Sequence, residues 1–128
     1  MLSQFTPATT LATANLPKAR TFYEETLGLT LEREGMGGLY YTAGAGRVLV
    51  YESQYAGTNK ATAMTFDVPT TDFDAEVERL RAKGVTFQTF DLEGVEWKDG
   101  IASMGETVRA VWFTDPDGNI LNVSTGMP

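Results

Sequence analysis

The chain lacks both side chains that most often carry acid–base, nucleophilic and metal chemistry near neutral pH, because its 128 residues include no Cys and no His. A disulfide framework, a thiolate nucleophile, a Ser-His-Asp triad and an imidazole metal ligand are therefore excluded. Any general acid or base must be Asp, Glu, Lys or Tyr. No base, nucleophile and oxyanion donor stand together at a recognisable spacing.

Trp97 is a large aromatic side chain in an otherwise polar stretch, residues 93–100, which also carries several acids. As a loop between two strands, this stretch could close over a bound ligand, or its Trp could simply cover the edge of the core. A second polar stretch, Asp115-Pro116-Asp117-Gly118, has the composition of a tight turn, which favours a structural role for its two acids.

Composition limits the class of protein and its partners. With 42% hydrophobic residues in 128, the chain is long enough for one domain with a core. Its 10 basic and 17 acidic side chains give a net charge of −7, with the basic residues scattered along the chain, so nucleic acid and anionic membrane are poor partners. No signal peptide and no apolar run of roughly 20 residues is found, which predicts a cytoplasmic location and no membrane span.

The elements that must position these side chains follow the same order twice. In the first half we expect a strand over residues 8–14, a helix from Asn15 to Gly28 with Pro17 in its first turn, and three strands separated by glycine clusters. Those strands are predicted over residues 30–34, 39–42 and 47–53. Residues 54–60 have no clear period and are interpreted as a linker.

The second half restarts with a strand over residues 63–68 and a helix over 71–82, where Thr71 and Asp74 approximate a capping box. Strands are then predicted over residues 86–90, 101–104, 108–114 and 119–124. The repeated order predicts an α+β fold in a single domain, residues 1–128, with one βαβββ unit over about 7–53 and a second over about 61–126.

Two sequence motifs resemble a known family. Residues 15–29, Asn-Leu-Pro-Lys-Ala-Arg-Thr-Phe-Tyr-Glu-Glu-Thr-Leu-Gly-Leu, are similar to its D-L-x-x-A-x-x-F-Y-x-x-x-L-G-L pattern, and residues 112–119 are similar to F-x-D-P-D-G-N. The chain thus resembles the vicinal-oxygen-chelate superfamily of glyoxalases, bleomycin-resistance proteins and extradiol dioxygenases. The resemblance implies curved mixed sheets around a cleft and pairing of two chains as a homodimer.

The same resemblance places the metal ligands of that family at Ala8, Leu49, Ala63 and Asn122. An amide and three hydrocarbon side chains cannot offset the cost of dehydrating a divalent cation. Glu52 lies near the least secure of the four positions, but no shift of register supplies a His. We therefore expect neither a metal nor any other cofactor.

If those four positions face the cleft, strand alternation directs four further candidate positions inward. Thr10 and Trp112 match places where fosfomycin-resistance relatives have a pocket threonine and a pocket tyrosine. Asp67 is the only acid placed inside and is a candidate base or counter-charge, although it could instead cap the following turn. Tyr51 and Trp112 could alternatively fill the sheet interior. With the loop residue, the predicted ligand-binding set is Thr10, Tyr51, Asp67, Trp97, Trp112 and Asn122.

This mixture of aromatic surface and a few polar groups suits a small organic ligand. The leading hypothesis is a protein of the glyoxalase/bleomycin-resistance kind that binds a drug or metabolite in a metal-free cleft, and the net charge of −7 suits a cationic ligand. One alternative is a metal-independent lyase or isomerase that uses Asp67, a Tyr hydroxyl or substrate positioning. Another is a domain that only associates with other proteins.

Overall fold

In the computed structural model, which describes residues 1–127, the chain contacts cluster into two units. The first comprises Met1–Ala63 together with Asp115–Asn119, and the second comprises Met64–Thr114 together with the residues from Ile120 onward. The short turn of residues 115–119 thus belongs to the first unit, although the strands on either side of it belong to the second. No helix in the described part of the chain is long and apolar enough to cross a membrane.

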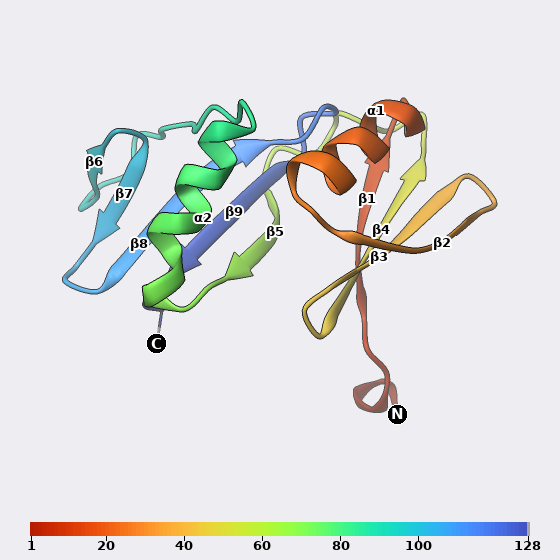
Figure 1. The fold of residues 1–128 in the computed structure, drawn as a ribbon, viewed down its shortest axis with the longest axis horizontal. Helices are drawn as coiled ribbons and strands as arrows, with labels where there is room; N and C mark the ends of the chain where they lie inside the picture. The colour runs from red at the N-terminus through yellow and green to blue at the C-terminus, as the bar shows by residue number, and fades with distance from the viewer. Residues whose placement is uncertain (128) are drawn as a thin grey trace. The chain divides into compact units, whose positions relative to one another are not determined.

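The first unit has the predicted βαβββ order (Figure 1). Its sheet has the strand order β1-β4-β3-β2, in which β1 runs parallel to β4 and the other pairs are antiparallel. The elements of this unit are η1 (Leu2–Gln4), β1 (Ala8–Thr13), α1 (Leu16–Thr21), η2 (Phe22–Thr26), β2 (Thr30–Gly35), β3 (Gly38–Ala43) and β4 (Gly46–Glu52).

The first helix begins where its capping residue predicts. The Asn15 side chain accepts a hydrogen bond from the Lys18 N–H at 3.1 Å, which satisfies one of the free donors of the first turn. After Thr21 the helix widens into the π-helical turn η2, closed by a 2.9 Å bond from the Leu27 N–H to the Phe22 carbonyl. Gly28, at φ +76°, then ends the helix in a backbone conformation that favours glycine. The π turn is a feature that hydrophobic spacing did not predict.

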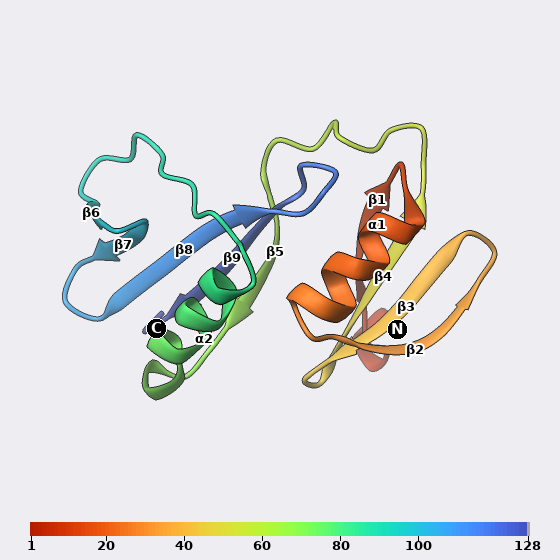
Figure 2. The same cartoon turned by 45° about the horizontal axis from the view of Figure 1, so that its top comes forward.

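The core of the first unit lies between this helix and one face of the sheet (Figure 2). Tyr23 on η2 packs on Tyr41 of β3 with ring centroids 6.0 Å apart, and both side chains are fully buried. Alternation gives the sheet a second face, which is turned away from the helix. There Thr10 pairs with Leu49, and Ala12 pairs with Tyr51.

The second unit repeats the arrangement with one additional short strand. Its sheet has the order β5-β9-β8-β7-β6, so the last strand lies beside the first strand, as β4 lies beside β1. Helix α2 packs on one face of this sheet through Phe73, Val77 and Leu80 (Figure 1). The elements are β5 (Thr62–Asp67), α2 (Thr70–Ala82), β6 (Glu96–Lys98), β7 (Ile101–Met104), β8 (Val108–Thr114) and β9 (Ile120–Thr125).

Three expectations for this unit are wrong. The stretch of residues 93–100 is not a loop throughout, because residues 96–98 form β6. Residues 86–90 do not form a strand: β7 already pairs with residues 108–110 of β8, and beyond it residues 86–90 make one isolated bridge, in which the Gln88 N–H donates to the Trp112 carbonyl at 2.8 Å. The capping box is also absent. Helix α2 begins at Thr70 after Pro69 without a side-chain cap, and Asp74 instead forms an ion pair with Arg109 at 2.8 Å.

Candidate functional site

Three aromatic side chains meet in the second unit: Trp112 of β8, Trp97 of β6, and Phe90 of the segment that precedes β6. The Trp97 and Trp112 ring centroids lie 5.9 Å apart, and Phe90 lies 5.7 Å from Trp112 and 6.4 Å from Trp97. All three side chains are half-buried. Rings at these separations form an aromatic surface that stays partly open to solvent, which we call the aromatic cluster.

Strand register explains why the two tryptophans share a face. Trp112 lies between Val111 and Phe113, which are 0% and 1% exposed on the side that packs on α2. Trp112 therefore points to the opposite side of the sheet. Trp97 pairs with Ala102, which in turn pairs with Ala110 of β8, so Trp97 lies on the same side as Trp112.

Asn122 is the cross-strand partner of Trp112 and is 6% exposed. Its Nδ2 donates to the Val111 carbonyl at 3.0 Å, which fixes the orientation of the amide. No atom of residues 1–127 donates a hydrogen bond to its Oδ1. The amide therefore offers one oriented acceptor beside Trp112.

Asp67 is exposed at the end of β5, and its carboxylate has no hydrogen bond or ion pair with any described residue. It does not cap α2, which has no side-chain cap. The structure records no contact between Asp67 and the aromatic cluster. Its carboxylate is exposed to solvent and open to a ligand. It is therefore not a buried general base.

Thr10 and Tyr51 lie on the face of the first sheet that is turned away from α1. Tyr51 is 40% exposed, and the exposed Thr10 hydroxyl donates to the Ala8 carbonyl at 3.1 Å. Tyr40 lies on this face as well, since it pairs with Leu49, and the Arg33 guanidinium lies 4.3 Å from the centre of its ring. Strand alternation through β3 is the signal that identifies Tyr40, whereas nothing in the sequence pattern identifies Phe90.

The four family metal positions do not fit a metal. Ala8 and Ala63 end in a methyl group, Leu49 ends in a hydrocarbon, and the Asn122 amide nitrogen is already bonded to a main-chain carbonyl. Glu52 alternates with Leu49 and so lies on the other face of β4. Within residues 1–127, no group of three or more acidic side chains is placed to hold a metal ion.

A buried polar network in the first unit joins the two family motifs. The Tyr23 hydroxyl donates to the Asp115 carboxylate at 2.6 Å, and the other oxygen of that carboxylate accepts from the N–H groups of Asp117 and Asn119, each at 2.9 Å. Burial, reinforced by the neighbouring Asp115, raises the pKa of the Tyr23 hydroxyl far above its ordinary value. Asp115 thus stabilises the turn through these hydrogen bonds, as the turn composition predicts, and is not a free catalytic acid.

The comparisons agree with this architecture. The model of the Glyoxalase/Bleomycin resistance protein/Dioxygenase superfamily matches residues 6–123, and the chain belongs to this family. It is 35% identical over 122 residues to a glutathione transferase FosA from Serratia marcescens, a match that covers 91% of the chain and 77% of the relative.

Two solved structures illustrate the fold. A glyoxalase/bleomycin resistance protein/dioxygenase from Alicyclobacillus acidocaldarius superposes with a TM-score of 0.75 at 16% identity, covering 97% of this chain and 92% of that one. The fosfomycin resistance protein FosX from Mesorhizobium loti superposes with a TM-score of 0.69 at 14% identity, covering 97% and 93%. The α+β fold with two repeated units that the sequence predicts is therefore confirmed.

Proposed function

We propose that this protein binds a small organic molecule, a drug or metabolite with a planar apolar part, against the aromatic cluster and without a resident metal. The observation that carries the proposal is the cluster of Phe90, Trp97 and Trp112, which leaves three half-buried rings on the sheet face away from α2. Phe113, which packs on α2, is 1% exposed, whereas the three rings of the cluster keep part of their surface open, where a ligand can contact them.

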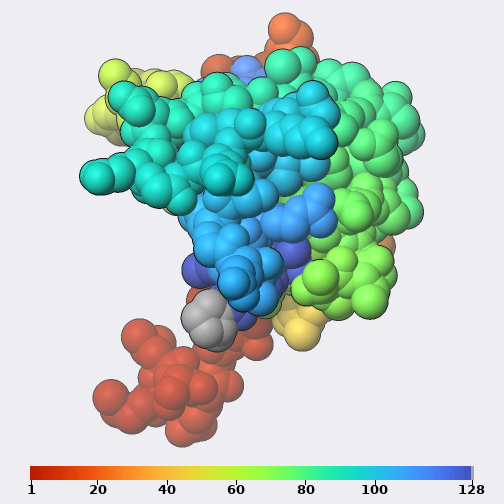
Figure 3. Space-filling model, turned by 90° about the vertical axis from the view of Figure 1, so that its left-hand side faces the viewer, coloured from red at the N-terminus to blue at the C-terminus, as the bar shows by residue number. Residues whose placement is uncertain are grey.

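Polar groups near the aromatic cluster can orient a ligand and favour one sign of ligand charge. The Asn122 Oδ1 is an oriented acceptor next to Trp112, and pockets for small molecules commonly combine apolar area with a few such groups. The segment from Asp91 to Asp99, coloured cyan in Figure 3, carries exposed acids around Trp97. These acids and the net charge of −7 favour a neutral or cationic ligand over an anionic one.

The names of the relatives refer to small organic molecules. The family and the two structures are named for resistance to bleomycin or fosfomycin, and the curated relative is named a glutathione transferase. Within their own units, Thr10 and Tyr51 on the first sheet and Asp67 at the end of β5 are also proposed to contact a ligand. The proposal also includes a homodimer and a cytoplasmic location.

Native mass spectrometry of the protein purified from its source tests the proposal, because one spectrum reports bound molecules, metal and subunit number. We expect a retained small molecule and no divalent ion. Trp112→Ala should lose the molecule, and Tyr55→Ala, which truncates a 68% exposed aromatic outside the cluster, should keep it.

Isothermal titration with bleomycin, fosfomycin and glutathione then asks whether a ligand named for a relative binds this chain. A molecule retained equally by Trp112→Ala and by the wild type would place the site elsewhere. A tightly held divalent ion would overturn the metal-free part of the proposal.

A further inference from the structure

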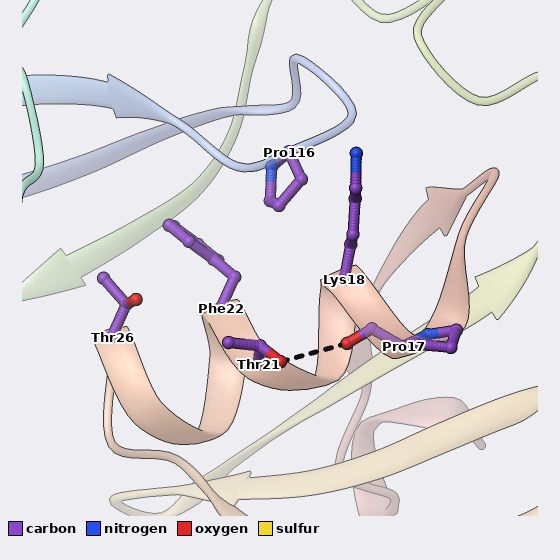
Figure 4. Close-up of a pocket in the computed structure, with 6 residues that line it drawn as sticks. All are labelled: Pro17, Lys18, Thr21, Phe22, Thr26 and Pro116. Carbon is purple, nitrogen blue, oxygen red and sulfur yellow. Dashed lines mark hydrogen bonds between the residues drawn. The ribbon is translucent and has the colours of Figure 1, made fainter.

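The outer surface of the first helix carries an open groove of about 460 Å³ that is separate from the proposed site (Figure 4). It lies entirely within the first unit and on the helix side of that unit, whereas Thr10 and Tyr51 lie on the sheet face turned away from the helix. The residues that line it are Pro17, Lys18, Thr21, Phe22, Thr26 and Pro116.

The π turn shapes this groove. Tyr23 points inward, where it is fully buried and its hydroxyl is bonded to Asp115, while the preceding residue, Phe22, contributes its half-buried ring to the groove wall. The two rings meet edge to face at 5.1 Å, so the Phe22 ring is supported from below by a fixed partner. Widened helical turns of this kind are often found at functional sites.

The opposite wall is also held in place. Pro116 belongs to the turn whose Asp115 carboxylate accepts from the N–H groups of Asp117 and Asn119. Figure 4 shows Pro116 above the helix, between Phe22 and Lys18. A groove with rigid apolar walls loses little conformational entropy when it binds a ligand.

One positively charged side chain, Lys18, lines the groove. Lys18 is exposed and forms no ion pair within residues 1–127, whereas Arg20, two residues further along the helix, pairs with Glu24 at 2.9 Å. The Thr21 hydroxyl is engaged with the Pro17 carbonyl at 3.2 Å, and the Thr26 hydroxyl has no partner in the described chain. The polar groups left for a ligand are therefore one ammonium and one hydroxyl, both of which can donate to an anion.

From this geometry we infer a second binding site, which takes a small amphipathic monocarboxylate. The apolar part of the ligand lies between Phe22 and the two prolines, and its carboxylate meets the Lys18 ammonium. This ligand class differs from the neutral or cationic class proposed for the aromatic cluster, so the two sites are expected to be independent.

The test uses 4-phenylbutyrate as the probe, with 4-phenylbutanol as its uncharged counterpart, in ¹H–¹⁵N NMR titrations of the whole chain. We expect saturable shifts at Lys18, Phe22 and Thr26 with a dissociation constant of about 1 mM, as befits a ligand of this size. The indole N–H signals of Trp97 and Trp112 should not move. The alcohol should bind more weakly than the acid.

Two variants locate the site. Lys18→Gln should weaken binding of the acid about threefold, the size of an exposed ion pair, without affecting the alcohol, and Lys60→Gln should have no effect. Thr21→Tyr places a ring in the groove and should weaken both probes by about tenfold or more.

The inference fails if no saturable shifts occur, if the shifts are confined to the two indoles, or if acid and alcohol bind equally. Unchanged affinity in Lys18→Gln would also overturn it. Because the readout is specific to the first helix, such a failure would leave the proposal for the aromatic cluster standing.

Discussion

At the scale of single residues, Asp115 shows how a motif can identify a fold without carrying its chemistry. Its carboxylate accepts from the Tyr23 hydroxyl, from two backbone N–H groups and from the Asn119 amide at 2.8 Å. The Asn119 amide also donates to the Ala12 carbonyl at 3.1 Å. The helix, β1 and the turn are thus joined through two buried side chains, Asp115 and Asn119, which connects the two motifs.

Tyr23→Phe should lower the free energy of unfolding by about 1–3 kcal/mol, because it leaves a buried carboxylate without one of its donors. Urea denaturation at pH 7 measures this, with Tyr55→Phe as a control that removes an exposed hydroxyl from the connecting segment. A cost for Tyr23→Phe no larger than that of the control would show that the bond is not stabilising.

The same tyrosine makes stability depend on alkaline pH. Burial and a hydrogen-bonded carboxylate raise the pKa values of both Tyr23 and Tyr41 above the ordinary value of 10.0. The folded chain then holds these protons more tightly than the unfolded chain, so stability is fully present below about pH 10 and falls as the pH rises further.

We expect a loss of about 1.4 kcal/mol per pH unit for each such tyrosine above that value. Denaturation midpoints measured between pH 8 and pH 11 test the slope, which should be shallower in Tyr23→Phe. A midpoint independent of pH over this range would contradict the assignment.

At the scale of elements, alternation along β8 places core residues on one face of the sheet and Trp112, a residue of the proposed ligand site, on the other. Phe113 and Val111 face α2, and Trp112 faces away from it. Trp112→Ala should therefore cost less than about 3 kcal/mol, whereas Phe113→Ala should cost about 3–5 kcal/mol. Thermal melts of both variants decide the point, and a larger loss for Trp112→Ala would mean that the cluster is core.

The sequence predicted those elements whose signals are local. The Asn15 cap, the glycine after each helix and the turn at residues 115–118 predict both helices and the strand β8, and alternation along β8 predicts that Trp112 lies on the face opposite Val111 and Phe113. The sequence does not predict strand β6, because this strand has only three residues and pairs on one side only. The approach of Phe90 to Trp112 depends on the path of a loop, which periodicity does not encode.

At the scale of the whole molecule, the chain has the family fold, but the positions that the resemblance assigns to metal ligands carry no charged or imidazole side chain. Because none of Ala8, Leu49, Ala63 and Asn122 offers a charged or imidazole group, metal removal should leave the protein unchanged. We expect incubation with EDTA to alter neither the melting temperature nor the far-UV circular dichroism. A melting temperature that falls with EDTA and recovers with one added divalent ion would contradict this.

Association is the remaining property of the whole molecule, and the expected state is a homodimer, by analogy with the family. Sedimentation equilibrium should therefore give twice the 14.0 kDa of one chain at micromolar concentrations.

Exposed apolar side chains such as Leu2, at 85% exposure, and Phe5, at 68%, are available to an interface, but a net charge of −7 on each chain opposes pairing. Screening reduces that repulsion, because the Debye length shrinks from about 30 Å at 0.01 M salt to about 8 Å at 0.15 M. The dimer should consequently tighten as salt rises over this range, and a charge-balanced interface would show the opposite trend. A monomer from micromolar to submillimolar concentration at 0.15 M salt would remove the support for pairing altogether.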